Sequence, residues 1–280
     1  MESAATPHNR VSFLTRLRLA FSDPTKLRRA IFSRLRPVPF RLGISRLWPG
    51  TYVGYLPERY SDHYEQYVQA GGAFRHRSAR RFYKGNQVNN RGDLTRFYFL
   101  NMVCDQILKE GLRGDIAELG VYKGNTAFLL ADLARRMGKT TYLLDTFGGF
   151  SSEDLRGIDA ATGLHFGDTS LASVQQLVGT DHVHYIQGYF PESSSQMRDD
   201  LSFCLVHLDC DLYAPFQAAL RYFYPRLVSG GFLILHDYAN AHWKGAEKAV
   251  DEFFADKPEK VIPIPDKSGT AVLRKIGGTR

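Results

Sequence analysis

The chain has 280 residues, of which 44% are apolar and 13% aromatic, so it can bury a sizeable core and wholesale disorder is excluded. Residues 1–100 hold 18 lysines and arginines against six acids, a net +12. Residues 101–280 hold 18 against 23, a net −5, which leaves the whole chain at +7. The basic charge would by itself suggest nucleic acid or an anionic membrane. No nucleic-acid-binding motif accompanies it, so we do not expect a nucleic-acid partner.

The three cysteines form no CxxC pair and leave an odd one over, so neither a disulfide framework nor a zinc site is encoded. No apolar run approaches the roughly 18 residues needed to span a bilayer. The apolar stretch over residues 11–21 is interrupted by Arg16 and Arg18, which makes it a poor signal-peptide core. We therefore expect a cytoplasmic protein, with attachment to a membrane surface as the alternative.

Residues 1–92 are predicted to form a basic N-terminal extension and helical cap. Asp23 and Pro24 are typical of a helix start, and apolar residues then recur at helical spacing as far as Pro37. Basic residues crowd the rest of this helix, so residues 11–36 are a candidate for peripheral contact with a membrane or with a partner subunit. The alternative is that the apolar stripe packs on its own domain while the arginines are solvated.

Apolar strands alternate with amphipathic helices from residue 93 onward. The expected strands cover residues 115–119, 141–145, 182–187, 203–209, 232–236, 260–264 and 270–275, and the expected helices cover 94–110, 125–137, 170–178, 214–227 and 244–255. This alternation predicts, for residues 93–280, an α/β domain with a doubly wound, mostly parallel seven-stranded sheet and helices on both faces. The short link over residues 265–269 predicts that the final strand is antiparallel. Ligands of such sheets bind beyond the carboxyl ends of the strands, so functional side chains are expected directly after each strand.

A glycine-containing turn follows the first expected strand. Glu118 precedes it, Gly120 and Gly124 lie within it, and a helix starts directly afterwards. Glycines let the backbone approach a ligand, and the free amides of a helix start attract anions. The spacing is neither GxGxxG nor a P-loop, which disfavours dinucleotides and nucleoside triphosphates. Glu118 would repel a pyrophosphate but suits a cationic ammonium group. Plain turn chemistry is the alternative.

Two further strand ends carry residues suited to an adenosine. Asp145 closes the second strand and precedes Thr146, and an acid there can accept both ribose hydroxyls of an adenosine cofactor. Capping of the following turn is the alternative for Asp145. Gln187, Gly188 and Tyr189 follow the third strand and offer an amide and an aromatic surface suited to an adenine ring.

Acidic residues follow the fourth and fifth strands, whose ends are expected to lie side by side. Asp209 and Asp211 end the fourth strand, and His236 and Asp237 end the fifth. Carboxylates that meet in one cleft raise each other's pKa unless a cation neutralises them. A divalent metal with oxygen ligands, and with His236 as an optional nitrogen ligand, resolves this conflict. Helix capping is the alternative for either pair alone.

The chain resembles the macrocin, mycinamicin and novobiocin family of S-adenosylmethionine-dependent sugar O-methyltransferases in six segments. These are ELGVYKGNTA, LLDTFGGF, IQGYFPES, HLDCDLYAPFQAALRYFYPRLVSGG, ILHDY and WKGAEKAVDEF, in this order. The resemblance spans about residues 93–276 and does not cover the basic first fifty. It implies a class I methyltransferase (Rossmann-like) fold, S-adenosylmethionine as cofactor, and a divalent metal, usually magnesium.

The resemblance also implies roles for individual residues. Asp209 and Asp237 would bind the metal, and Asp211 would be the general base. The family commonly has a second acid where this chain has His236, whose imidazole can also be a metal ligand. Imidazole suits magnesium less well than manganese, iron or zinc, so Mn²⁺ or another ion is an alternative to Mg²⁺. The resemblance implies that the methionine end of the cofactor is held by Glu118, Gly120, Tyr122, Gly124, Asn125 and Thr126, and its ribose by Asp145. Together with Thr146, Gln187, Gly188 and Tyr189, these residues are the predicted cofactor-binding set.

The predicted activity is therefore methylation of a hydroxyl on a sugar or glycosylated natural product, with Asp211 taking the proton. One alternative is a phenolic or polyketide hydroxyl as acceptor. Another is a noncatalytic membrane-associated protein that retains the fold. We also expect a homo-oligomer, and the loop over residues 150–169 is long enough to be a lid.

Overall fold

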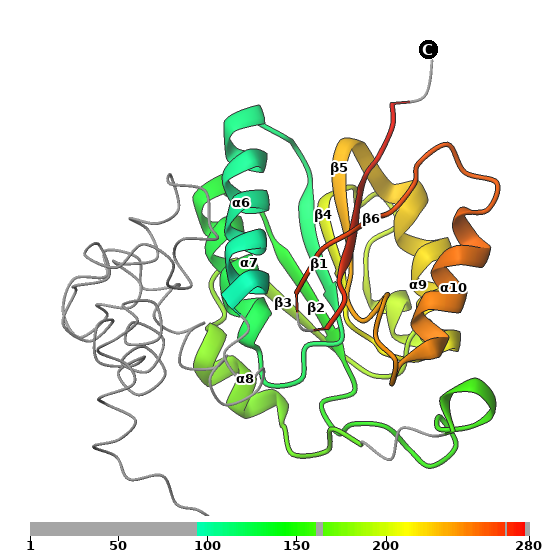
Figure 1. Ribbon diagram of the computed structural model, residues 1–280. Helices are drawn as coiled ribbons and strands as arrows, with labels where there is room; N and C mark the ends of the chain where they lie inside the picture. The colour runs from blue at the N-terminus through cyan, green and yellow to red at the C-terminus, as the bar shows by residue number, and fades with distance from the viewer. Residues whose placement is uncertain (1–93, 161–164, 267, 278–280) are drawn as a thin grey trace, which may run out of the picture. The chain divides into compact units, whose positions relative to one another are not determined.

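A computed structural model describes residues 94–160, 165–266 and 268–277 of the protein (Figure 1). The predictions made for residues 1–92, including the extension and the basic helix within residues 11–36, lie outside these described residues. Helix α6 (Leu94–Glu110) is the first described element. None of the helices in the described part is long and apolar enough to cross a bilayer.

A seven-stranded sheet with the order β3-β2-β1-β4-β5-β7-β6 forms the centre of the domain. Strands β1 to β5 pair in parallel, and β7 pairs antiparallel with β5 and β6. The predicted doubly wound, mostly parallel sheet with an antiparallel final strand is therefore confirmed. The strands are β1 (Asp115–Leu119), β2 (Thr141–Asp145), β3 (Val183–Gln187), β4 (Phe203–Leu208), β5 (Leu227–Leu235), β6 (Ile262–Pro263) and β7 (Ala271–Arg274).

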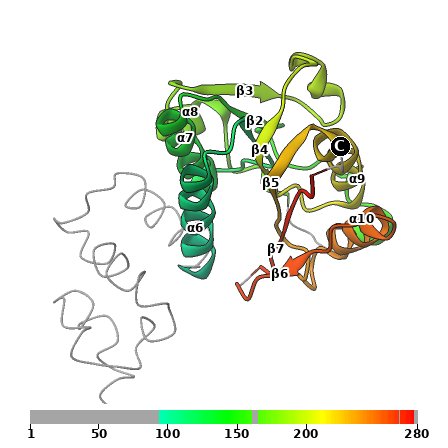
Figure 2. The same ribbon diagram turned by 90° about the horizontal axis from the view of Figure 1, so that it is seen from above.

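Helices cover both faces of the sheet (Figure 2). Helices α6, α7 (Asn125–Met137) and α8 (Leu171–Val178) lie on one face, and α9 (Tyr213–Phe223) and α10 (Lys244–Phe254) on the other. Strand β4 is at the centre and every one of its residues is buried, as expected for a parallel strand packed on both sides. This rigid core fixes the positions of the strand ends, where the polar residues lie.

Three predicted element boundaries are wrong, and prolines are involved in two of them. The helix expected over residues 214–227 ends at Phe223, because Pro225 has no backbone N–H to continue it. A 3₁₀ turn follows, and β5, which was expected over residues 232–236, begins already at Leu227. The strand expected over residues 260–264 is reduced to β6, whose Pro263 cannot donate to a ladder and is tolerated at the sheet edge.

Candidate active site

A cleft of about 770 Å³ opens at the carboxyl ends of strands β1 to β5. It lies where a doubly wound sheet binds ligands, and its volume is within the range of small-molecule sites, about 300–1,000 Å³. Its walls include ten of the predicted site residues, namely Gly120, Tyr122, Asp145, Thr146, Gly188, Tyr189, Asp209, Asp211, His236 and Asp237. The other five, which lie outside its wall in the described part of the chain, are Glu118, Gly124, Asn125, Thr126 and Gln187.

The turns that form the cleft have unusual backbone geometry. Tyr122, Asp211 and Asp237 have positive φ values of 49°, 58° and 60°, in the left-handed region that non-glycine residues seldom adopt. Gly120 has a φ of 87°, and a Cβ there would lie 1.9 Å from the carbonyl oxygen of Asp209. Only glycine therefore allows the ends of β1 and β4 to approach so closely. Such backbone outliers cluster at functional sites.

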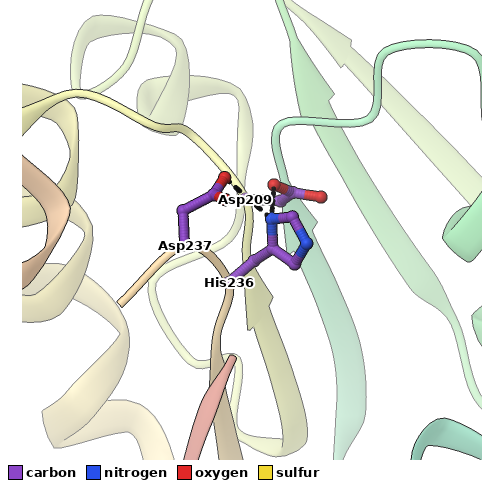
Figure 3. A group of neighbouring side chains, drawn as sticks. All are labelled: Asp209, His236 and Asp237. Carbon is purple, nitrogen blue, oxygen red and sulfur yellow. Dashed lines mark hydrogen bonds and ion pairs between the residues drawn. The ribbon is translucent and has the colours of Figure 1, made fainter. Parts of the chain in front are cut away.

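Asp209, His236 and Asp237 converge at the ends of β4 and β5 (Figure 3). His236 Nδ1 lies 2.6 Å from Asp209 Oδ1 and 2.9 Å from Asp237 Oδ2, so one ring nitrogen faces both carboxylates. The three side chains each offer one ligand atom, and these atoms lie within 4.8 Å of one another. Two carboxylates and an imidazole at this spacing are a donor set that fits a divalent cation.

The charges in this cluster shift one another's pKa values. Burial and Arg96 lower the pKa of His236, but the carboxylates of Asp209 and Asp237 outweigh them and raise it to about 10. Burial acts to raise the pKa of Asp209, but His236 and Arg96 outweigh it and hold that pKa well below its usual value. Burial, together with Asp237 and Asp209, raises the pKa of Asp211 well above its usual value. The pKa values of Asp209 and Asp211 are thus shifted in opposite directions although one residue separates them.

Arg96, on α6, is a site residue that the sequence reasoning missed. It lines the cleft and is only 4% exposed. Its Nη2 donates to Asp209 Oδ2 at 2.8 Å and to Thr126 Oγ1 at 3.1 Å. A signal was present in the sequence, because Arg96 falls on the apolar stripe of its helix with Leu100 and Val103, where a cation needs a buried partner.

Glu118 lies elsewhere than expected. Its side chain is 2% exposed beneath the cleft, and Oε1 is 2.9 Å from His207 Nδ1. Burial and the Asp209 carboxylate raise the pKa of Glu118 well above its usual value, which favours the neutral form. Burial and Arg96 lower the pKa of His207 to about 3. The structure thus places the Glu118 carboxyl against His207 and not on the cleft wall, where the predicted contact with an ammonium group would form.

Asp145 connects the turns that follow β1 and β2. Oδ2 accepts hydrogen bonds from the backbone N–H groups of Val121, at 2.6 Å, and Tyr122, at 2.9 Å, and Oδ1 accepts from Phe147 N–H at 2.6 Å. Thr146 Oγ1 also donates to Oδ1, at 3.5 Å, so all of the roughly four acceptor positions of the carboxylate are in use and this long contact is the weakest of them. Tyr189, after β3, is half exposed at the cleft rim.

The loop between β2 and α8 covers one side of the cleft in its described parts. Its Asp159 is 6% exposed, and Oδ2 accepts the backbone N–H of Tyr213, the first residue of α9, at 3.0 Å. Phe150 and Phe166 in this loop pack against Trp243, which precedes α10. These contacts attach the loop to the start of α9 and to the segment before α10. That the loop acts as a lid stays a prediction.

Residues 92–267 match the sequence profile of the macrocin O-methyltransferase (TylF) family. The chain belongs to this family. It is 27% identical over 161 residues to a mycinamicin III 3''-O-methyltransferase of Micromonospora griseorubida, in a match that covers 52% of this chain and 63% of the relative. It is 28% identical over 160 residues to a Streptomyces olivaceus 4'-O-methyltransferase of a rhamnosyl-tetracenomycin, covering 52% and 61%. This TylF-family chain thus spans less than two thirds of either relative.

Solved structures confirm the predicted class I methyltransferase fold for the TylF-family chain. The O-methyltransferase NovP aligns with a TM-score of 0.57 at 21% sequence identity, covering 65% of this chain and 80% of NovP. The calicheamicin methyltransferase CalS11 aligns with a TM-score of 0.54 at 22% identity, covering 68% and 85%. At these identities the likeness establishes the fold alone.

Proposed function

We propose that this TylF-family chain transfers the methyl group of S-adenosylmethionine to a hydroxyl of a sugar or glycosylated natural product. The observation that carries the proposal is the convergence of Asp145, Asp209, Asp211 and Asp237 on one cleft, at the edge of the sheet where this fold binds ligands. Two relatives are named for methylating mycinamicin III and a rhamnosyl-tetracenomycin, which supports a glycosylated acceptor.

The cofactor would lie along the turns after β1, β2 and β3. Asp145 would accept hydrogen bonds from the ribose hydroxyls in place of the long contact from Thr146 Oγ1. Gly188 and Tyr189 would contact the adenine, and Gly120 and Tyr122 lie nearest the methionine end. When bound, S-adenosylmethionine supplies an electrophilic sulfonium methyl group. The excess of acids in the cleft favours this cationic cofactor over its neutral product.

Asp209, His236 and Asp237 would hold a divalent cation, which their converging donor atoms fit. When bound, the cation supplies Lewis acidity that makes an aliphatic hydroxyl more acidic. Carboxylates accept Mg²⁺, while the imidazole of His236 favours Mn²⁺, Fe²⁺ or Zn²⁺. We propose Mg²⁺ or Mn²⁺ as the resident ion.

Asp211 is the proposed general base. It lies on the cleft wall beside the proposed cation site, and burial together with Asp237 and Asp209 raises its pKa. A base works best when its pKa is near the working pH, so this environment gives Asp211 more affinity for a proton than Asp209 has. The protein's part in methyl transfer is then to position the acceptor oxygen in line with the methyl group and to remove its proton.

The test is product detection with isotopically labelled S-adenosylmethionine. The protein is incubated with labelled cofactor and extracts of the source organism, and methylated products are identified by mass spectrometry. The wild type is expected to label a glycoside.

The Asp211→Asn variant is expected to lose about 10²- to 10⁴-fold in rate, the usual contribution of a general base, while its cofactor affinity, measured by calorimetry, is unchanged. Substantial residual transfer by the variant would contradict the base assignment, and Asp181→Asn on the surface is the matched control.

Self-association and peripheral membrane contact through residues 11–36 belong to the same proposal. Light scattering of the full chain tests the first, with a homo-oligomer as the expected result. Co-sedimentation of the full chain with anionic vesicles tests the membrane contact.

A further inference from the structure

Arg96 is a buried cation on the cleft wall. Arginine is seldom buried unless an anion pairs with it. The guanidinium is therefore held in this place by the negative charge of the site, through Asp209.

Arg96 joins the two halves of the cleft through a single nitrogen. Nη2 donates both to Asp209, which directly follows β4, and to Thr126, the second residue of α7. The first turn of α7 has free amides, which add a further attraction for anions. One wall of the cleft thus presents a guanidinium and, 2.8 Å away, a carboxylate.

This pair of charges is the complement of an α-amino acid. The methionine end of S-adenosylmethionine carries a carboxylate and an ammonium group on one carbon, and Arg96 and Asp209 offer the opposite charge to each. Glu118 cannot take the ammonium group, because its side chain lies outside the cleft wall and bonds to His207. The backbone of Asp209 lies next to Gly120, on the turn proposed to hold that end, and Arg96 contacts the Asp209 carboxylate.

We propose that Arg96 recognises the carboxylate of the cofactor's methionine end, with Asp209 as the counter-charge for its ammonium group. This inference rests on the proposed function, because it assumes that S-adenosylmethionine is the cofactor. It gives the buried arginine a binding role, and it gives Asp209 the contact with the ammonium group that the sequence had suggested for Glu118.

The test compares S-adenosylmethionine with decarboxylated S-adenosylmethionine, which lacks only the carboxylate. Calorimetry measures the dissociation constants of both for the wild type and for Arg96→Met and Arg96→Lys. The wild type is expected to prefer the intact cofactor by about 10- to 100-fold, as for a hydrogen bond to a charged group. Arg96→Met should bring this ratio close to one, and Arg96→Lys, which keeps the charge, should give an intermediate value.

The ratio separates recognition from packing. Methionine retains an unbranched apolar stem, so if Arg96 serves only to pack α6, the Arg96→Met variant will keep the wild-type ratio, which would overturn the proposal. A wild-type ratio near one would overturn it as well. Arg136→Met, on the exposed face of α7, is the matched control and should behave as the wild type.

Failure of the proposed function gives a different result. If the wild type binds neither ligand, S-adenosylmethionine is not the cofactor and both proposals fall. If the wild type binds both ligands and the Arg96 variants keep the wild-type ratio of dissociation constants, only the inference about Arg96 is wrong. Should Arg96→Met bind neither ligand because it does not fold, Arg96→Lys decides, since a ratio reduced at least threefold supports the proposal and an unchanged ratio overturns it.

Discussion

Asp209 and Asp211 illustrate how one short segment can supply two acids with different tasks. The carboxylate of Asp209 contacts two cationic groups, Arg96 and His236, which hold its pKa low and keep it ionised. Asp211 faces further carboxylates in a buried position, which raises its pKa. Pairs of acids whose environments move their pKa values apart are typical of a ligand-binding acid beside a proton-transfer acid. The environment of each residue therefore supports its proposed role.

His236 should determine which cation the cluster prefers. Replacing its imidazole by a carboxylate, in His236→Asp, gives an all-oxygen donor set, which suits Mg²⁺ better. We expect Mg²⁺ to gain about 10-fold or more in competition against Mn²⁺ relative to the wild type. Electron paramagnetic resonance of Mn²⁺, titrated with Mg²⁺, measures this competition without any acceptor substrate.

The same substitution removes a cation that faces two carboxylates. Without added metal, His236→Asp should therefore have a lower melting temperature than the wild type, and added Mn²⁺ should restore more of it, since a ligand that binds only the folded state stabilises that state. His242→Asp, at an exposed position outside the cluster, is the control. An unchanged competition ratio in His236→Asp would show that His236 is not a ligand.

At the scale of elements, Asp159 connects a cleft loop to the starts of two helices. Its Oδ2 accepts the N–H of Tyr213 on α9, and a Cβ on Gly245, the second residue of α10, would lie 2.1 Å from Oδ1. The carboxylate thus lies between two helix N-termini, whose macrodipoles both attract it. Residue 245 must lack a side chain for this contact to form.

Gly245→Ala should therefore detach the loop between β2 and α8, which holds Asp159, from the starts of α9 and α10. The added methyl group would meet the Asp159 carboxylate and the Tyr213 backbone, so we expect a loss of about 1–3 kcal/mol in the free energy of unfolding. Chemical denaturation measures that loss. Limited trypsin digestion should cut faster after the exposed Arg156 in the same loop.

Two comparisons test the cause of this effect. Gly148→Ala adds a methyl group in nearly open space and should change neither stability nor digestion appreciably. If the clash involves the carboxylate, the effects of Asp159→Ala and Gly245→Ala will not be additive, because the first removes the group that the second displaces. Additive effects would contradict the proposed contact.

The sequence predicts the strand ends well, because they depend on local patterns. Alternating strands and helices predict the sheet, and the sheet brings Asp209 to His236 and Asp237. The position of Glu118 depends on a partner far along the chain, since its register pairs it with His207 on β4. A parallel strand is buried on both faces, so its hydrophobic pattern does not reveal which way an acid points. The role of Arg96 also depends on partners far along the chain, Asp209 and Thr126, which lie on other elements.

At the scale of the whole molecule, the charge is divided between the cleft and the front of the chain. The described cleft wall carries seven acidic residues, against the two arginines Arg96 and Arg156. The acids are Asp145, Glu153, Asp154, Asp159, Asp209, Asp211 and Asp237. Such a wall suits cationic ligands and would be repelled by an anionic surface. We therefore expect any attraction to an anionic membrane to come from residues 1–92, since residues 1–100 carry a net charge of +12.

Vesicle binding by the full chain should accordingly be electrostatic and should depend on the basic segment. Each lysine or arginine near an anionic surface contributes about 1 kcal/mol, and salt screens this attraction, since the Debye length is about 8 Å at physiological ionic strength. We expect co-sedimentation with phosphatidylserine vesicles at low salt, little with phosphatidylcholine, and loss of binding at high salt.

A variant with glutamine at Lys26, Arg28, Arg29, Arg34 and Arg36 should no longer bind. The control replaces five basic residues of the described domain, Lys109, Arg113, Arg135, Arg136 and Lys139, by glutamine and should still bind. If the wild type does not bind at low salt, or if both variants lose binding equally, the basic segment is not a membrane contact.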